Sequence, residues 1–168
     1  MLYPYAQYGL KVLRMFHIVD DTNPICKIVT AMLKRLGYET ISFGCPEDYI
    51  SFVNSPGFKD PMAVFTDITM PAMTGYQMMN IISELKPDLR FIVMTAAPEI
   101  RSEHAIKACM YLVKPITLKN LTKVVGSLSK CHAFSPTYDH KCTSVDDRRV
   151  FPIEGWSCPH RCEESCSS

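Results

Sequence analysis

Residues 16–21 read Phe-His-Ile-Val-Asp-Asp, a short apolar run that passes directly into two carboxylates. A helical pattern follows, with apolar residues at i, i+3, i+4, i+7, i+8 and i+11 from Ile25 to Leu36, and Gly37 marks its end. An apolar strand, a polar turn and an amphipathic helix in this order are typical of the first half of a strand–helix–strand unit.

The same alternation continues along the chain to residue 130. Strands that are apolar throughout are buried on both faces, as in a parallel sheet between helices, and right-handed crossovers then favour a doubly wound sheet. The sequence therefore predicts an α/β fold with five parallel strands and helices on both faces. We expect further strands at 39–43, 63–66, 91–94 and 111–113, and helices at 46–54, 76–85, 98–109 and 118–130.

The 168 residues suit one domain with extensions, because five of the eight cysteines fall beyond residue 130. We expect an N-terminal extension at 1–14, a domain at 15–130, and an irregular, flexible Cys-rich tail at 131–168. Met15 is an alternative start for the chain.

Charge and hydropathy exclude several classes of function. The net charge is +1, which argues against nucleic acid or an anionic membrane surface as partner. No apolar run approaches the roughly 18 residues of a membrane span, and the N-terminus lacks the apolar core of a signal peptide. We expect a cytoplasmic protein.

Polar residues stand where the predicted strands end. Asp20 and Asp21 follow the first strand, Asp67 the third, Thr95 the fourth and Lys114 the fifth. Ligands of open parallel sheets bind outside the carboxyl ends of the strands. If the first and third strands are neighbours, the three carboxylates converge on one crevice.

This set of residues suits phosphoryl transfer. Three close carboxylates ionise together only with a compensating cation, and oxygen ligands suit Mg²⁺. The metal and Lys114 would hold the phosphoryl oxygens while Asp67 attacks in line, and Thr95 would donate a hydrogen bond.

Each of these residues also has a structural explanation. Asp20 and Asp21 could cap the following helix, Asp67 could be a turn residue, and Thr95 and Lys114 could simply end strands. Their joint occurrence, each at a strand end, favours the functional interpretation. Tyr111 remains open between a core aromatic and a rotating switch.

Four motifs resemble the receiver domain of two-component response regulators, the CheY-like family, over about residues 15–130. They are HIVDD at 17–21, FTDITMPAMTG at 65–75, MTA at 94–96 and YLVKP at 111–115. The resemblance implies a flavodoxin-like fold with strand order 2-1-3-4-5.

The resemblance also implies roles for the residues of the acidic site. Asp67 resembles the phospho-acceptor. Asp21 resembles a direct ligand of Mg²⁺, and Asp20 one that acts through water. Thr69 would offer its backbone carbonyl to the metal, and its side chain stands where the family tunes the lifetime of the phosphoryl group.

The remaining motif residues resemble the family's phosphate-sensing and switching groups. Thr95 and Lys114 resemble the hydroxyl and amine that bind phosphoryl oxygens, and Ala96 is the small neighbour that leaves room for the group. Tyr111 resembles the switch aromatic, and Pro115 the proline after a cis peptide bond. The segment between Thr95 and Lys114 is shorter than is usual, which affects the face through which many receivers form homodimers.

These observations predict a stand-alone receiver rather than a conventional enzyme, since it catalyses only its own phosphorylation and dephosphorylation. A sensor histidine kinase or phosphotransfer protein would donate the phosphoryl group, and a downstream protein would read it. The alternatives are a degenerate receiver that only binds partners, or a haloacid-dehalogenase-type phosphohydrolase. A haloacid-dehalogenase-type phosphohydrolase would need a second acidic residue at the position of Thr69.

The cysteines allow several interpretations. Cys158, Cys162 and Cys166 recur every four residues with His160 among them, which permits zinc, although reduced thiols or a redox role also fit. The earlier Cys26, Cys45 and Cys109 are expected to be small buried hydrophobes.

Overall fold

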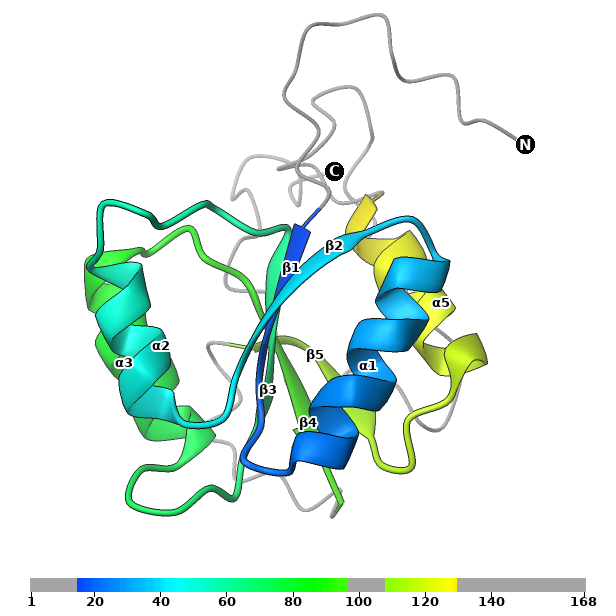
Figure 1. Cartoon of the computed structure of the whole chain (residues 1–168), viewed down its shortest axis with the longest axis horizontal. Helices are drawn as coiled ribbons and strands as arrows, with labels where there is room; N and C mark the ends of the chain where they lie inside the picture. Colours follow the sequence, from blue (N-terminus) through cyan, green and yellow to red (C-terminus); the bar gives the residue numbers. More distant parts are fainter. Residues whose placement is uncertain (1–14, 97–107, 130–168) are drawn as a thin grey trace, which may run out of the picture.

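The computed structural model describes residues 15–96 and 108–129, which form a parallel five-stranded sheet in the order β2-β1-β3-β4-β5 (Figure 1). Helices α1 and α5 cover one face of the sheet, and α2 and α3 cover the other. The strands are β1 Met15–Val19, β2 Glu39–Phe43, β3 Ala63–Asp67, β4 Phe91–Thr95 and β5 Ala108–Val113. The helices are α1 Asn23–Arg35, α2 Pro46–Val53, α3 Gly75–Leu85 and α5 Leu118–Ser129.

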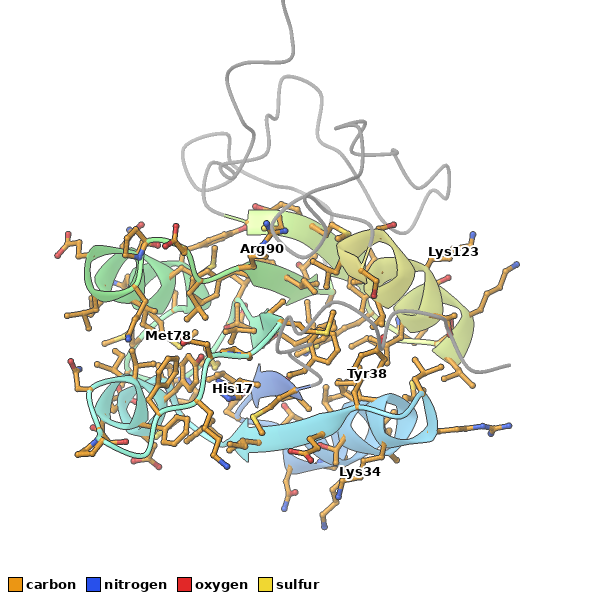
Figure 2. The ribbon with its side chains drawn as sticks, turned by 90° about the horizontal axis from the view of Figure 1, so that it is seen from above. His17, Lys34, Tyr38, Met78, Arg90 and Lys123 are labelled. Atoms are coloured by element: carbon orange, nitrogen blue, oxygen red, sulfur yellow. The ribbon has the colours of Figure 1, made fainter. Side chains whose placement is uncertain are left out.

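Two hydrophobic clusters hold these layers together, one on each face of the sheet. The first lies under α1 and α5 and includes Val29, Leu33 and Leu121. The second lies under α2 and α3, where Figure 2 shows Met78 between the helices and the sheet. The doubly wound architecture predicted from the apolar strands is thus confirmed.

The register of the strands brings their polar ends to one edge of the sheet. β1 lies between β2 and β3, and Val19 is paired with both Phe43 and Thr66. On the other side of β3, Asp67 is paired with Met94. The residues that follow β1 and β3 are therefore neighbours, as the candidate site requires.

The fifth strand begins earlier than the sequence predicted. Ala108 and Cys109, assigned to the end of a helix over 98–109, lie in β5. Ala108 is paired with Phe91 and Met110 with Ile92, so an irregularity in register accommodates Cys109. Pairing with β4 overrides the helical preference of Ala108. The rest of the predicted helix lies outside the described residues.

Local signals explain where two helices end and begin. After α1, Gly37 has φ +88°, a conformation that glycine adopts without strain, which confirms it as the stop. Before α3, the Thr74 side chain accepts from the Gln77 backbone while the Gln77 side chain accepts from Thr74. This capping box starts α3 at Gly75, one residue before the predicted start.

The two helix layers carry opposite charge. Helices α1 and α5 contain Lys27, Lys34, Arg35, Lys119 and Lys123 and no acidic residue. Helices α2 and α3 contain Glu47, Asp48 and Glu84 and no Lys or Arg. None of the helices in the described ranges is long and apolar enough to cross a bilayer.

Candidate functional site

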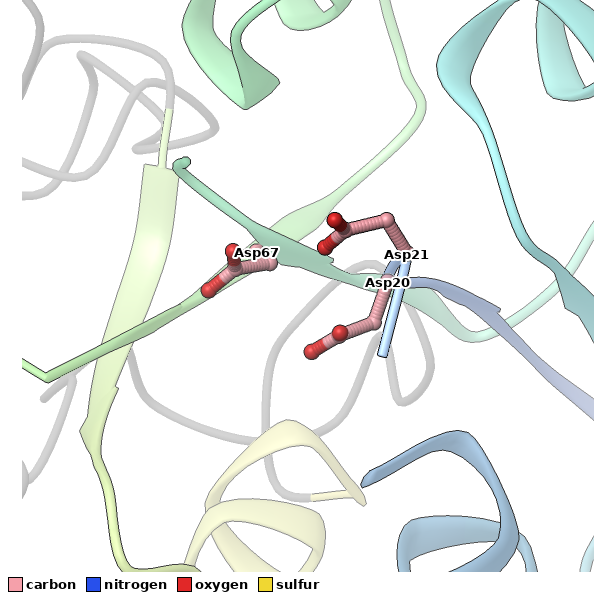
Figure 3. Close-up of side chains that lie close together, drawn as sticks. All are labelled: Asp20, Asp21 and Asp67. Carbon is pink, nitrogen blue, oxygen red and sulfur yellow. The ribbon is translucent and has the colours of Figure 1, made fainter. Parts of the chain in front are cut away.

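Three carboxylates gather at the carboxyl edge of the sheet (Figure 3). Asp20 and Asp21 directly follow β1, and Asp67 is the last residue of β3. One oxygen of each lies within 4.8 Å of the others. Asp20 is fully buried and Asp67 is 8% exposed, whereas Asp21 is exposed. The cluster is therefore accessible from the side of Asp21.

The Lys114 ammonium contacts two of these carboxylates. Lys114 directly follows β5, the strand at the edge of the sheet. Its Nζ lies 3.0 Å from Asp20 Oδ2 and 2.8 Å from Asp67 Oδ1. Its backbone N–H donates to the Thr95 carbonyl at 2.7 Å, which ties the start of the segment after β5 to the end of β4. The ammonium is thus held between the two buried acids by charge-assisted hydrogen bonds.

The electrostatics of the site follow from burial and from this contact. Burial raises the pKa of Asp67, and the charge of Asp20 adds to this, while the hydrogen bond and charge of Lys114 oppose it. Burial alone would lower the pKa of Lys114, but its bonds to Asp67 and Asp20 raise it overall. Lys114 therefore stays charged beside the acids.

The donor set fits a hard divalent cation. Three carboxylates face a single ammonium, which leaves two formal negative charges uncompensated when all are ionised. A divalent cation would cancel them, and an all-oxygen set with room for water suits Mg²⁺. Receiver domains generally bind Mg²⁺ at an acidic pocket of this kind.

Asp20 and Asp21 differ in whether their carboxylate oxygens already accept hydrogen bonds. Asp20 Oδ1 accepts from the Thr22 backbone N–H at 2.8 Å, and its Oδ2 accepts from Lys114. Asp20 thus fixes the backbone of Thr22, the residue before α1, but it does not cap the helix, because no side chain bonds the free N–H groups of its first turn. Asp21 is exposed and makes no comparable contact within the described ranges, which leaves its oxygens available to a ligand.

The backbone of Asp67 is fixed by a close approach of α3. A Cβ added at Gly75 would lie 2.0 Å from the Asp67 carbonyl oxygen, so only glycine fits there. The Thr66 hydroxyl donates to the same carbonyl at 2.9 Å, and the Gly75 N–H donates to Ile68 O at 2.9 Å. Gly75 ends the motif at 65–75, but its close contact with Asp67 could not be predicted from the sequence, because the contact depends on how α3 packs against the end of β3.

The loop between β3 and α3 contains one strained residue. Ala72 has φ +63°, the left-handed region that residues with a Cβ avoid. Next to it, the Met73 N–H donates to Pro71 O at 2.7 Å, which closes a tight turn. The sequence offers no signal for this conformation, since alanine is common in helices and strands alike.

The other predicted site residues lie around this centre. Thr95 is 5% exposed at the end of β4, and Ala96 follows it on the surface. Thr69 is exposed two residues beyond Asp67. The Lys114–Pro115 peptide bond is cis, the geometry that the family resemblance implied.

Tyr111 lies in the cluster under α2 and α3 and is 1% exposed. Burial raises the pKa of its hydroxyl, and the neighbouring Tyr76 raises it further. In this structure Tyr111 is therefore a core aromatic whose hydroxyl interacts with that of Tyr76.

Three of the eight cysteines lie in the part of the chain that the structure describes. Cys26 and Cys109 are buried as expected, but Cys45 is only partly buried because it precedes α2 at the edge of the sheet. The predicted tail at 131–168, with its possible zinc ligands, lies outside the described residues, as does the extension at 1–14. Those interpretations stay predictions.

Comparison with known proteins agrees with this geometry. The family model of the response regulator receiver domain matches residues 16–126. The chain is 34% identical over 113 residues to the DNA-binding transcriptional regulator NtrC of Azospirillum brasilense, covering 64% of this chain and 22% of that protein. It is 31% identical over 122 residues to the two-component response regulator ORR26 of Oryza sativa, covering 70% of this chain and 20% of that protein. The chain thus spans about a fifth of the length of these relatives.

Solved structures show the same fold. The chemotaxis response regulator CheY4 of Vibrio cholerae superposes with a TM-score of 0.62 at 20% identity, over 69% of this chain and 98% of that one. The response regulator TrrA of Thermotoga maritima, solved in complex with Mg²⁺-BeF, gives a TM-score of 0.61 at 26% identity, over 68% and 98%. With its acidic cluster, its bridging lysine and the family match over most of its length, this chain belongs to the response regulator receiver domains of two-component signalling.

Proposed function

We propose that the chain accepts a phosphoryl group from a phosphohistidine onto Asp67 and signals through the resulting change of conformation. The observation that carries this proposal is the contact of one Lys114 ammonium with both Asp20 and Asp67 in a buried acidic cluster. The donor would be a sensor histidine kinase or a phosphotransfer protein, the partners with which receiver domains interact.

The chemistry is a displacement at phosphorus. An Asp67 carboxylate oxygen forms the new P–O bond as the P–N bond to the donor imidazole breaks, and the imidazole leaves with the bonding electrons. Asp67 is suited to this role because its backbone is held by Gly75 and Thr66, which fixes the direction of attack. Lys114, already 2.8 Å from Asp67, is placed to bind a phosphoryl oxygen.

The acidic cluster would hold a magnesium ion. Asp21, Asp67 and the Thr69 carbonyl are the proposed direct ligands, with Asp20 acting through water because both its oxygens already accept hydrogen bonds. When bound, Mg²⁺ supplies positive charge to the phosphoryl oxygens in the transition state.

Thr95 and Tyr111 are the proposed switch. Thr95 lies at the end of β4 and would donate its hydroxyl to a phosphoryl oxygen, with Ala96 leaving space for the group. Tyr111 lies on the paired strand β5. A shift of Thr95 toward Asp67 would change the room available to the Tyr111 ring, and the new surface would be read by a downstream protein.

Phosphorylation of purified protein tests the proposal. Incubation with acetyl phosphate and Mg²⁺ should add one phosphoryl group, and Asp67→Asn should remove the labelling while the fold persists. Asp48→Asn, an exposed acid on α2, is the matched control and should be labelled normally. Labelling of Asp67→Asn at the wild-type level would reject Asp67 as acceptor. A folded wild type that is not labelled would instead support a receiver that acts only as a binding module.

A further inference from the structure

His17 is a titratable residue that the proposed phosphoryl chemistry does not use. It lies in β1, has no exposed surface, and its ring points to the side of the sheet covered by α2 (Figure 2). Its Nδ1 lies 3.0 Å from the Tyr49 hydroxyl of α2, whereas its Nε2 is buried without a hydrogen-bond partner among the described residues. The contact joins the central part of the sheet directly to α2.

Aromatic rings surround the imidazole. The ring centroids of Tyr49, Phe52 and Phe58 lie 5.6, 5.5 and 5.8 Å from that of His17, and Phe43 lies 6.4 Å away. All four meet it edge to face, at interplanar angles between 70° and 76°. A buried imidazole with one hydrogen bond and an apolar enclosure is stable only in its neutral form.

The enclosure also selects the tautomer. If Nε2 carries the proton, Nδ1 accepts from the Tyr49 hydroxyl and the Nε2–H faces electron-rich aromatic surroundings. If Nδ1 carries it, the Tyr49 hydroxyl hydrogen loses its partner and the Nε2 lone pair faces the rings. The first arrangement satisfies more groups, so the neutral ring is protonated on Nε2.

Protonation of the His17 imidazole disrupts its hydrogen bond with Tyr49. A charged imidazole has a donor at Nδ1, where the Tyr49 hydroxyl also donates, so the hydroxyl would have to turn and lose its acceptor. Of the charged groups near the cluster, Lys86 Nζ lies 5.0 Å from the Phe58 ring centroid and would repel a charged imidazole, whereas the Asp60 carboxylate, which acts on Tyr49, would attract it and offset part of the cost of burying the charge. Attraction to the rings offsets only part of the lost hydration.

We propose that His17 is an acid-released latch, a neutral buried imidazole that fastens α2 to β1 through Tyr49 and releases it on protonation. The lowering of its pKa from 6.5 to about 4 by burial agrees with this geometry. A lowered pKa in the folded state makes the latch fully effective above pH 6.5, and its contribution to stability is lost as the pH falls toward 4. The helix pair α1 and α5 packs on the opposite face and has no such link to the imidazole.

Unfolding of the full chain by denaturant, with His17→Phe as comparison, tests the latch. Between pH 7 and pH 4 the unfolding equilibrium constant of the wild type should rise roughly 100-fold more than that of the variant, since most of the stability that follows from the lowering of the His17 pKa from 6.5 to about 4 is lost over this range. Other acids titrate in both proteins and cancel. Equal pH dependence in the two proteins would overturn the proposal.

Two spectroscopic readouts keep the test decisive if His17→Phe does not fold. In the wild type, imidazole nitrogen shifts should report the Nε2–H tautomer at pH 7 and a titration midpoint well below 6.5. Tyr49→Phe removes the hydroxyl donor and should raise that midpoint. Amide exchange at pH 4.5 should increase in α2 before α1. A wild-type midpoint near 6.5, or equal exchange in α1 and α2, would reject the latch.

Discussion

Lys114 has two partners, and this double contact sets the charge balance of the site before any cation binds. Its ammonium neutralises part of the Asp20 and Asp67 pair, while Asp21 stays exposed and unshared within the described ranges. Asp21 is therefore the acid whose oxygens are most available to an added cation. The family resemblance implied different roles for these adjacent acids, but the contact of Lys114 that separates them could not be predicted from the sequence.

The response of stability to Mg²⁺ should depend on Asp21. Binding of the cation to the folded state alone raises the melting temperature by mass action, so millimolar Mg²⁺ should stabilise the wild type. Asp21→Ala should lose this shift because it removes a proposed direct ligand. Asp48→Ala, remote on α2, should keep it. A thermal shift in Asp21→Ala equal to that of the wild type would place the metal elsewhere.

Ala72 offers a test of local strain. Its φ of +63° is unfavourable for a residue with a Cβ by about 1–2 kcal/mol, and glycine relieves this at some entropic expense. Ala72→Gly should therefore stabilise the protein by about 1 kcal/mol, measured as a higher denaturant midpoint at constant slope. Ala31→Gly, on the exposed side of α1, should destabilise it by a similar amount. A loss of stability in both variants would contradict strain at Ala72.

At the scale of the element, the strands and helices were predictable where the apolar pattern is long and regular. The apolar face from Ile25 to Leu36 and the strand at 91–94 gave the right type of element. The start of β5 was not predictable, because Ala108 and Cys109 suit either a helix or a strand and only pairing with β4 determines which one forms. The His17–Tyr49 contact was missed for a related reason: it joins residues 32 positions apart, and no local pattern marks it.

The junction between β3 and α3 can be tested by adding one methyl group. Gly75→Ala places a Cβ 2.0 Å from the Asp67 carbonyl oxygen, so either α3 or the acceptor must move. We expect a loss of about 1–3 kcal/mol in stability and slower labelling by acetyl phosphate. Denaturant unfolding and a labelling time course measure the two effects.

Gly126 in α5 provides the matched control for this substitution. A Cβ there meets nothing within 4 Å, and alanine favours the helix, so Gly126→Ala should stabilise the protein by about 1 kcal/mol. Its labelling should be unchanged. If Gly75→Ala behaved like Gly126→Ala, the close approach of α3 to Asp67 would have no importance for the acceptor.

At the scale of the whole molecule, the hydrophobic cluster under α1 and α5 is completed by residues up to Leu128, and the cluster under α2 and α3 by residues up to Tyr111. The strand order was implied by the family resemblance. Given that order, the convergence of Asp20, Asp21, Asp67 and Lys114 could be predicted, because parallel strands end at one edge and these residues lie at those ends. The downstream partner of the receiver could not be predicted from the sequence. The stand-alone arrangement, the homodimer and the role of the tail depend on residues outside the described ranges, and they stay predictions.

Removing residues 131–168 should leave the receiver active. Since α5 closes the cluster beneath it by Leu128, a chain ending at Lys130 should fold and accept a phosphoryl group from acetyl phosphate at the rate of the full chain. Circular dichroism and a labelling time course check both points. A truncated protein that unfolds, or that labels much more slowly, would show that the tail supports the domain.

The opposite charges of the two helix layers have an electrical consequence. With Lys and Arg on α1 and α5 and acids on α2 and α3, the four helices contribute a dipole moment with a component perpendicular to the sheet. A dipole of this kind experiences a torque in the field of any charged body that diffuses toward it. At low ionic strength the core therefore turns its α1 and α5 side toward a negative neighbour before contact. At about 0.1 M salt the effect fades beyond about 10 Å, and the encounter becomes undirected.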